Sequence, residues 1–370
     1  MDTGAGLLVK EPVVELLGIS PEDVRAYLRA FFKTRNEAEF RTKQVEEWLF
    51  DRHARSFDEM TNLPSNLQVE LGNEFSLTAL ESNYVARSSD GTVKHLWRLN
   101  DGESVESVLI PTKDRLTLCL SSQVGCALGC RFCATGHFGF RRQLRPAEIV
   151  AQYSDSSRVA LHDFKRPITN IVYMGMGEPL ANLDSVINSL DTLHRGFRKG
   201  ARRITVSTVG LIPGILKLAQ RPEPFELAIS LHAPLHELRL ELMPIESRYP
   251  LPDLFEALHS FQRQKKRRIS FEYTLIDGVN DEPKLARALA DVARGLTCFV
   301  NLIPFNPIPA ISEWRASSPS KIARFSEALN ERGIQNAVRR PRGRDIAAAC
   351  GQLRLARKTT VSDNKKTGLY

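Results

Sequence analysis

Three cysteines near the middle of the chain are spaced to act together on one metal centre. The segment QVGCALGCRFCATG places Cys126, Cys130 and Cys133 in the spacing C-x3-C-x2-C. Three such thiolates can bind three irons of a four-iron, four-sulfur cluster, and because no fourth cysteine is nearby, one iron stays open to another ligand. The amino and carboxylate groups of S-adenosylmethionine (SAM) can occupy that iron, and an electron passed to the sulfonium then releases a 5′-deoxyadenosyl radical.

A structural zinc site is the alternative for the same cysteines. A closed zinc knuckle needs a fourth cysteine or histidine at short spacing, and His137 is the one candidate nearby in the sequence. The aromatic residue inside C-R-F-C and the glycine-rich segment MGMGEP further along the chain favour the cluster over zinc.

Glycine and polar residues recur where later strands are expected to end. In MGMGEP, Gly177 lets a ligand approach the backbone, and Glu178 can accept a hydrogen bond from the amino group of a ligand. The further candidates at strand ends are Ser207, Ser230, Leu231, His232 and Asn306. Each alone is an ordinary capping or loop residue, but a ring of them around one cluster predicts a cofactor pocket.

The segments that carry these residues alternate between strand and helix patterns. Strands are expected at VKHLWRL, SVESVLIP, RLTLCLSS, ITNIVYMGM, RRITVSTVG, FELAISLHA, RISFEYTLI and CFVNLIPF. Helices are expected at LDSVINSLDTLHRGF, PDLFEALHSFQRQ and PKLARALADVARG. This alternation predicts an α/β fold with parallel strands joined by helices, a complete or partial (β/α) barrel whose functional residues follow the strand ends.

Residues 10 to about 85 have helical periodicity instead. Pro21 precedes the segment VRAYLRAFF, and TKQVEEWLFDR follows, with apolar positions three and four residues apart. We therefore predict a small helical accessory domain over residues 1–90, and a core with a C-terminal cysteine loop over residues 91–352. Residues 353–370 form a polar tail that is expected to be disordered.

Length and composition limit the class of protein. A chain of 370 residues is long enough for one large domain with a smaller one attached. Every apolar run is broken before about 18 residues, which predicts no membrane span. The start, MDTGAGLLVKEP, lacks the features of a secretory signal, so the expected location is the cytoplasm. Six cysteines in such a chain favour metal or redox chemistry over a disulfide framework.

The net charge of +8 fits a phosphate-rich partner. The basic residues gather in four runs, which are Arg141-Arg142, Arg202-Arg203, Lys265-Lys266-Arg267-Arg268 and the run Arg339, Arg340, Arg342 and Arg344. The alternative for any single run is a solvated helix face or loop.

Three cysteines lie outside the cluster motif. Cys119 precedes the first cluster ligand by seven residues, and Cys298 begins an apolar strand, where a lone cysteine is usually a small core residue. Cys350 has a different setting, because it lies in RGRDIAAACGQL, a basic loop that runs into small residues.

At this point the sequence resembles the radical SAM RNA methyltransferases of the RlmN and Cfr type over nearly its whole length. The motifs that carry the resemblance include FRTKQVEEWLF, VESVLIP, LCLSSQVGCALGCRFCATG, YMGMGEPLAN, STVGLIPGI, SLHAPLHELRLELMPI, EYTLIDGVND, NLIPFNP and RGRDIAAACGQL. One departure is Ala310, where the family often has glycine after N-P-x-P. The resemblance implies a radical SAM core built as a partial (β/α) barrel, with SAM contacts at the seven strand-end residues named above.

The resemblance also implies a mechanism that uses two SAM molecules per turnover. Cys350 would take a methyl group from the first SAM, and the radical from the second would remove hydrogen from that methyl group. The resulting methylene would add to a carbon of adenine and join the protein to RNA. Cys119 would then attack the sulfur of Cys350 and release the methylated RNA as a disulfide forms, with Glu106 as the base for the proton on the attacked carbon.

The substrate expected from the resemblance is an adenosine of 23S rRNA. RlmN-type members methylate its carbon 2, and some also methylate an adenosine of tRNA, whereas Cfr-type members methylate carbon 8. GMGEPL and DGVND favour the RlmN type. The implied electron donor is a protein such as flavodoxin, and a monomer is expected. A non-catalytic RNA-binding protein with a structural cluster is the other alternative, although it would have no use for Glu106, Cys119 and Cys350 together.

Overall fold

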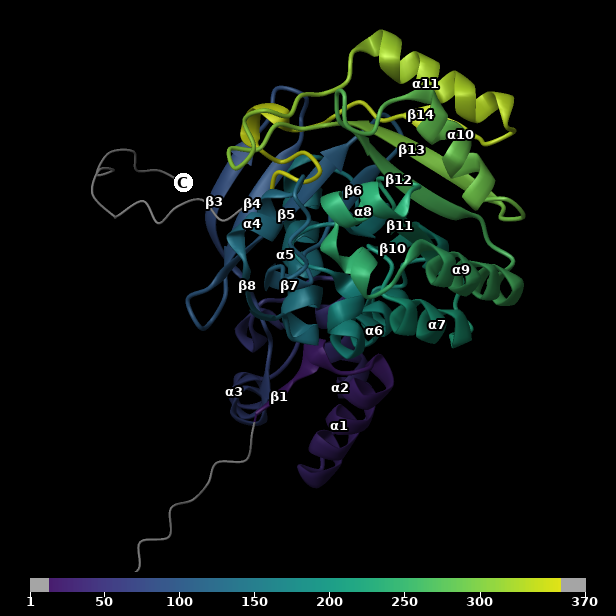
Figure 1. Cartoon of the computed structure of the whole chain (residues 1–370). Coiled ribbons are helices and arrows are strands. Elements are labelled where there is room, and N and C mark those ends of the chain that lie inside the picture. Colours follow the sequence, from purple (N-terminus) through teal and green to yellow (C-terminus); the bar gives the residue numbers. More distant parts are fainter. Residues whose placement is uncertain (1–12, 354–370) are drawn as a thin grey trace, which may run out of the picture. The chain divides into compact units, whose positions relative to one another are not determined.

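The computed structural model describes residues 13–353, so the expected polar tail over residues 353–370 lies outside the described residues except for Leu353. The chain divides into two compact units (Figure 1). Among the described residues, the first contains 13–80 together with 145–167 and 184–200, and the second contains 81–144, 168–183 and 201–353. No helix within residues 13–353 is long and apolar enough to cross a membrane.

The first unit is mainly helical. Its elements are β1 (Val14–Glu15), α1 (Pro21–Thr34), α2 (Phe40–Phe50), α3 (Ser65–Glu74), β2 (Phe75–Ser76), α5 (Pro146–Asp163), most of α6 (Leu183–Asp191) and a π-helical turn (Thr192–Gly196). Helix α1 begins where predicted, because the Ser20 hydroxyl accepts the Asp23 N–H and Pro21 occupies the first helical position. The helical pattern expected to about residue 85 ends earlier, since β3 begins at Glu81.

The core of the first unit is aromatic. Phe31 contacts Phe75 edge-on, with ring centroids 5.5 Å apart. The ring of Phe197 stacks on His53 at 5.4 Å and meets Phe50 edge-on at 5.2 Å. Burial lowers the pKa of His53 to about 4, so this imidazole is neutral and serves packing.

The second unit is built on one ten-stranded sheet with the order β14-β13-β12-β11-β10-β9-β6-β5-β4-β3. The strands are β3 (Glu81–Arg87), β4 (Val93–Arg98), β5 (Ser104–Pro111), β6 (Leu116–Cys119), β9 (Asn170–Tyr173), β10 (Ile204–Thr208), β11 (Glu226–Ser230), β12 (Ile269–Leu275), β13 (Cys298–Pro304) and β14 (Asn336–Val338). Strands β6 and β9 to β14 are parallel, and β3 to β5 extend the sheet in antiparallel order. Because β3 and β14 are its two edges, the sheet is an open, partial barrel, as predicted.

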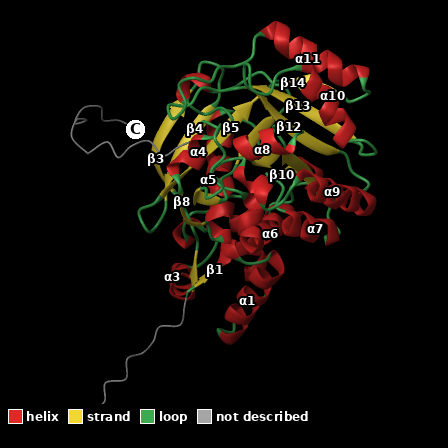
Figure 2. Cartoon of the chain, viewed as in Figure 1, coloured by secondary structure: helices red, strands yellow, loops and turns green. Residues whose placement is uncertain are grey.

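Helices follow the parallel strands along the chain, and Figure 2 shows them in red beside the yellow sheet. In the second unit they are α4 (Ala134–Phe138), α7 (Ile212–Gln220), α8 (His236–Leu242), α9 (Leu251–Lys265), α10 (Pro283–Val292) and α11 (Pro319–Glu331). Proline occupies the first position of α10 and α11, where its missing N–H costs nothing. Since the strands are parallel, their carboxyl ends and the loops after them share one edge of the sheet.

The antiparallel extension places three polar or thiol residues on one face of the sheet. Leu96 pairs with Glu106, Lys94 with Val108, and Val108 with Cys119. Directly paired residues point to the same face, and so do residues two apart on one strand. Lys94, Glu106 and Cys119 therefore share a face.

Candidate cofactor and thiol site

The cluster motif lies on a loop whose two ends are joined by a pair of short antiparallel strands. Strand β7 (Gln123–Gly125) pairs with β8 (Phe140–Gln143), and the cysteines lie between them. The Cys126 N–H donates to the Gly139 carbonyl at 2.9 Å. Gly125 has φ 78°, and a Cβ there would lie 1.8 Å from the Gly139 oxygen, so only glycine fits. The loop thus returns to the start of the motif and keeps the three cysteines together.

Cys130 is buried, and Cys126 and Cys133 are partly buried. Burial raises the pKa of Cys126 to about 12 and the pKa of Cys130 well above its ordinary value, and the neighbouring thiols add to both effects. Thiols in this setting become ligands when a metal's positive charge stabilises the thiolate. Within residues 13–353, no group of three His, Cys, Asp or Glu side chains is arranged to hold a single metal ion. A four-iron cluster does not require such a group, because each of its protein ligands binds a different iron.

The three cysteines line a cavity at the carboxyl edge of the sheet. Its walls include Gly177, Glu178, Ser207, Ser230, His232, Asn306, Phe132, Glu272, Thr274 and Cys350. Six of the seven residues predicted to contact SAM are therefore on this wall. The seventh, Leu231, is fully buried behind it, and its N–H donates to the Glu272 carbonyl at 3.0 Å.

The turn after β9 fixes the carboxylate of Glu178. One oxygen accepts the Leu180 N–H at 3.0 Å and the other accepts the Val209 N–H at 2.9 Å. Gly177 has φ 96° and approaches Gln123 so closely that a Cβ would lie 2.5 Å from that side chain. Burial raises the pKa of Glu178 to about 7. The Thr208 side chain also hydrogen-bonds this carboxylate, whose two oxygens offer about four acceptor positions, so one position is left for a hydrogen bond from a ligand.

His232 presents a neutral ring to the same cavity. Its Nδ1 accepts the Thr274 N–H at 2.9 Å, which leaves the proton on Nε2. Burial, with the Arg239 charge as a second cause, lowers its pKa to about 3. The ring meets Phe132 of the C-R-F-C segment edge-on at 4.4 Å, so the aromatic residue of the motif packs against the cofactor wall.

Glu272 is a site residue that the sequence pattern did not single out. It lies in the apolar strand β12, opposite Ser230 on β11, and it is almost fully buried. Burial raises its pKa to about 7, while a hydrogen bond from Asn301 at 2.7 Å acts in the opposite direction. An acidic residue inside the run ISFEYTL was the signal that could have identified it.

Asn306 connects the cofactor cavity to the segment that carries Cys350. Its Nδ2 donates to the Cys350 carbonyl at 3.1 Å, and its Oδ1 accepts from Arg344 Nε at 2.7 Å. The same segment is bonded to the cluster loop, because the Ala134 N–H donates to the Gly351 carbonyl at 2.7 Å. Cys350 is therefore held one residue away from a direct contact with the cluster motif.

A second cavity brings Cys119 and Cys350 together. Both thiols line it, and Cys350 also lines the first cavity. Cys119 packs with Val108, Met176, Ala348 and Leu353. Burial raises the pKa of Cys119 well above its ordinary value, and the nearby Glu272 carboxylate acts in the same direction on the pKa of Cys350, whose side chain is exposed. Both groups are therefore thiols at neutral pH, and each must lose a proton to act as a nucleophile.

Glu106 is buried next to this region, on the face of β5 that it shares with Cys119. Its Oε1 lies 3.1 Å from Lys94 Nζ, and its backbone carbonyl accepts the Ser121 hydroxyl at 2.5 Å.

Cys298, the sixth cysteine, is buried at the start of β13 and packs as a core residue, as predicted.

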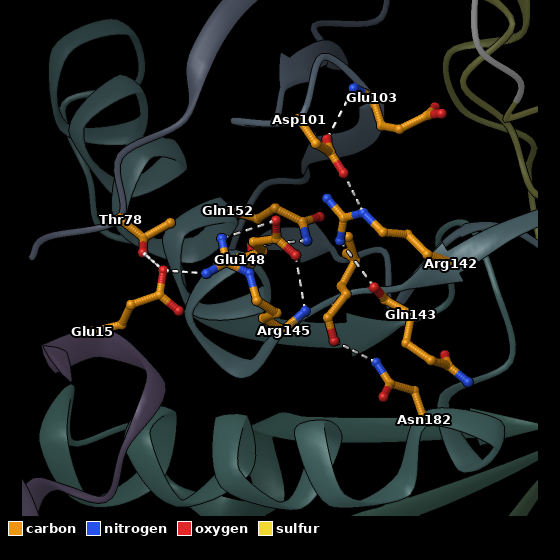
Figure 3. Close-up of polar contacts among 11 residues, drawn as sticks. Glu15, Thr78, Asp101, Glu103, Arg142, Gln143, Arg145, Glu148, Gln152 and Asn182 are labelled. Carbon is orange, nitrogen blue, oxygen red and sulfur yellow. Dashed lines mark hydrogen bonds and ion pairs between the residues drawn. The ribbon is translucent and has the colours of Figure 1, made fainter. Parts of the chain in front are cut away.

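Several of the basic residues are engaged within the second unit. Arg339 donates to Asn301 at 2.7 Å, and Arg342 lies 3.9 Å from Asp90. Arg142 points at Asp101, with 2.5 Å between nitrogen and oxygen (Figure 3). Arg339, Arg340 and Arg342 line the second cavity, so positive charge surrounds the opening to the two thiols.

Comparison with known proteins places this geometry in a family. Residues 120–289 match the Radical SAM superfamily, and residues 14–77 match the ribosomal RNA large subunit methyltransferase N-terminal domain. The chain is 48% identical over 93% of its length to the protein named "Probable dual-specificity RNA methyltransferase RlmN" from Gemmatimonas aurantiaca, of which 94% is covered. It is 43% identical over 92% of its length to "Dual-specificity RNA methyltransferase RlmN" from Marinobacter nauticus, with 92% of that protein covered. The crystal structure of a radical SAM methyltransferase from Sphaerobacter thermophilus superposes with a TM-score of 0.87 at 43% identity, over 93% of this chain and 99% of that one.

Proposed function

Because the chain belongs to the RlmN family of radical SAM RNA methyltransferases, we propose that it methylates carbon 2 of one adenosine in 23S rRNA and also an adenosine of tRNA. The cofactors of this superfamily are a [4Fe–4S] cluster and SAM. We assign the cluster to Cys126, Cys130 and Cys133, and the SAM contacts to Gly177, Glu178, Ser207, Ser230, Leu231, His232 and Asn306.

Cluster and SAM, when bound, supply a methyl group and a 5′-deoxyadenosyl radical. The residues of the chain determine where these are used. The neutral His232 ring and the Glu178 carboxylate offer a donor and an acceptor to the amino acid part of a ligand. The Phe132 ring packs on one side of His232 and keeps water out of this part of the cavity.

Cys350 carries the methyl group and becomes the point of attachment to adenine. Its place on the walls of both cavities supports this role, because the thiol can meet the cofactor on one side and Cys119 on the other. Glu106 takes the proton from the attacked carbon as the radical adduct gives up one electron. Cys119, as a thiolate, then attacks the Cys350 sulfur and a disulfide forms. The bond between that sulfur and the adenine-bound carbon breaks with its electron pair on the carbon, which takes up a proton to become the methyl group. The shared position of Cys350 is the observation that carries the proposal.

The two domains predicted from the sequence have different proposed tasks. We assign residues 1–90 to RNA binding and residues 91–352 to catalysis, in keeping with the match of residues 14–77 to a domain named after ribosomal RNA methyltransferases. We further propose a monomeric, cytoplasmic enzyme that receives electrons from a protein such as flavodoxin.

Nucleoside analysis of the product tests the proposal. The protein is purified and reconstituted without oxygen, incubated with SAM, a reductant and unmethylated 23S rRNA or tRNA, and the RNA is digested for mass spectrometry. We expect 2-methyladenosine from both RNAs. A product of 8-methyladenosine would assign the Cfr-type reaction instead, and no methyladenosine with a fully loaded cluster would contradict both. Cys350→Ala, which keeps the cluster ligands, is the inactive control.

A further inference from the structure

The turn between β3 and β4 holds the segment that leads to Cys350. The Asp345 carboxylate accepts from the Ser88 hydroxyl at 2.6 Å and from the Ser89 N–H at 3.1 Å. The Asp90 carboxylate accepts the Gly343 N–H at 3.0 Å. Residues more than 250 positions apart in sequence are thus joined at the start of the Cys350 segment.

Lys94 extends this attachment to the proposed base. It lies on β4 and is buried, and its ammonium nitrogen is 3.1 Å from Glu106 Oε1 and 3.0 Å from the carbonyl of Ala347. Ala347 has φ 49°, a left-handed conformation that is costly for alanine, and it lies three residues before Cys350. One side chain therefore contacts both the Glu106 carboxylate and the segment that carries the proposed methyl acceptor.

A buried ammonium between these partners has two physical effects. It offsets the cost of burying an ionised carboxylate, because the opposite charge lies 3.1 Å away. It also restrains the distance between that carboxylate and the Cys350 segment, because one ammonium group bonds both and movement of either partner would lengthen one of the two bonds. Both effects act on proton removal at the attacked carbon, and neither is needed when Cys350 accepts its methyl group.

We propose that Lys94 is a positioning residue that ties the Glu106 carboxylate to the Cys350 segment, so that proton removal and RNA release depend on it while methyl loading of Cys350 does not. This inference rests on the proposed function of Glu106 and Cys350.

Titratable residues lie on both strands that pair with the strand of Glu106. Across the strand pair lies Lys94, and on β6 the titratable residue of the same face is Cys119. His95 pairs with Ser107 and so points to the opposite face of the sheet, where it stacks on Trp97. Strand β7, which also contacts β5, has the sequence QVG and no titratable residue. In the Cys350 segment, Arg344 bonds Asn306 and Asp345 bonds Ser88.

The test separates the steps of a single turnover in Lys94→Met. Intact-protein mass measures methyl loading of Cys350, a denaturing gel measures the protein–RNA adduct, and nucleoside analysis measures release at several pH values. We expect wild-type loading, an adduct that persists, and slow release that recovers as pH rises. Each unit by which the Glu106 pKa comes to exceed the assay pH lowers the ionised fraction about tenfold. Wild-type release should lack this pH dependence.

Two further variants keep the outcome decisive. Lys94→Met with Glu106→Gln removes both charges, so it avoids an unpaired buried carboxylate and should release RNA no more slowly than Glu106→Gln alone. Lys113→Met, at an exposed lysine in the turn between β5 and β6, should behave as wild type. Hydrogen exchange of residues 343–350 should be faster in Lys94→Met than in wild type even without SAM or RNA.

The outcomes are distinguishable from failure of the proposed function. A wild-type enzyme that makes no methyladenosine refutes the function, and normal turnover by Glu106→Gln refutes the role of Glu106. If instead Glu106→Gln blocks release while Lys94→Met releases RNA at the wild-type rate with no pH dependence, the positioning role of Lys94 is wrong. Loss of methyl loading in Lys94→Met would overturn it as well.

Discussion

The side-chain nitrogen of Asn306 lies 3.1 Å from the backbone carbonyl oxygen of Cys350 and donates a hydrogen bond to it. Asn306 also lines the cavity proposed for SAM, and Arg344 donates to its other side-chain atom. One residue thus contacts both the cofactor cavity and the segment of the proposed methyl-accepting thiol. Any ligand that bonds Asn306 must share it with that segment or displace it.

Replacing Asn306 should therefore affect both partners. In Asn306→Ala we expect SAM affinity to fall about fivefold, the value of one hydrogen bond of about 1 kcal/mol, and hydrogen exchange of residues 344–353 to become faster. Calorimetry and exchange mass spectrometry measure the two effects. Ser207→Ala, on β10 in the same cavity wall, is the control that should weaken SAM binding without changing the exchange. Unchanged exchange in Asn306→Ala would mean that the segment is held by its other bonds alone.

Each of the three cluster cysteines should be required for both iron binding and activity. We expect Cys126→Ala, Cys130→Ala and Cys133→Ala each to lose iron and activity, because each thiolate holds one iron and no further cysteine lies in the motif. Iron analysis and the visible absorption of protein purified without oxygen measure the loss. Cys298→Ala, at a buried core position of β13, should keep its iron and most of its turnover. Full iron loading in any of the first three variants would contradict the assignment.

Two arginines of the run 339–344 should have different effects. Arg344 bonds Asn306 and the Phe305 carbonyl, so Arg344→Gln should slow methyl loading of Cys350 and leave the salt dependence of RNA binding unchanged. Arg340 lines the cavity that both thiols share, and Arg340→Gln should lower the salt slope by roughly 0.7 if it contacts one phosphate of a single strand. Binding titrations at several salt concentrations measure the slopes. Equal slopes for wild type and Arg340→Gln would show that this side chain does not contact RNA.

The buried carboxyl of Glu272 should make stability depend on pH. Burial raises its pKa from 4.5 to about 7, so the folded protein binds this proton more tightly than the unfolded chain does. The stabilisation is complete below pH 4.5 and is lost as pH rises through 7. Between pH 5 and pH 8 we expect wild type to lose about 3 kcal/mol relative to Glu272→Gln, which keeps an oxygen for Asn301. Urea unfolding at the two pH values measures this, with Glu331→Gln, at an exposed glutamate, as the control. Parallel pH profiles for wild type and Glu272→Gln would contradict it.

The sequence predicted those parts of the site that depend on local order. Strand and helix periodicity predicted the partial barrel, and the position of Ser207 at the end of a strand and of Glu178, His232 and Asn306 after strands followed from the general geometry of parallel sheets. The spacing of the cysteines within eight residues likewise predicted a metal site without any knowledge of the fold. These are short-range patterns, in which the chain itself fixes the neighbours.

Contacts between distant segments could not be predicted in the same way. The bond from Lys94 to Ala347 joins residues 253 positions apart, and a lysine in a strand is ordinarily taken for a solvent-facing residue. The ion pair of Arg239 and Glu246 is fully buried, and Arg239 also bonds the Val209 carbonyl. The sequence likewise contained no sign that these two charged residues are buried. Burial is set by the whole tertiary structure, so the charged residues that support a site look in sequence like surface residues.

Cys119 provides the sharpest test of the thiol chemistry. It shares a cavity with Cys350, lies on the same sheet face as Glu106, and is absent from the wall of the cofactor cavity. In Cys119→Ala, methyl loading of Cys350 and addition to adenine should therefore proceed, because neither uses this thiol. Release should fail, since no sulfur remains to attack Cys350 and accept the disulfide bond.

We expect Cys119→Ala to accumulate a protein–RNA adduct that survives denaturation and shrinks, on RNA digestion, to a modified nucleotide attached to Cys350. Mass spectrometry of tryptic peptides locates the attachment. Cys119→Ala combined with Cys350→Ala should form no adduct, because the attachment point is missing, and Cys298→Ala should form none because release remains intact. Normal turnover by Cys119→Ala with reversible RNA binding would show that the roles assigned to both cysteines are wrong, since the covalent route leaves no other way for RNA to depart.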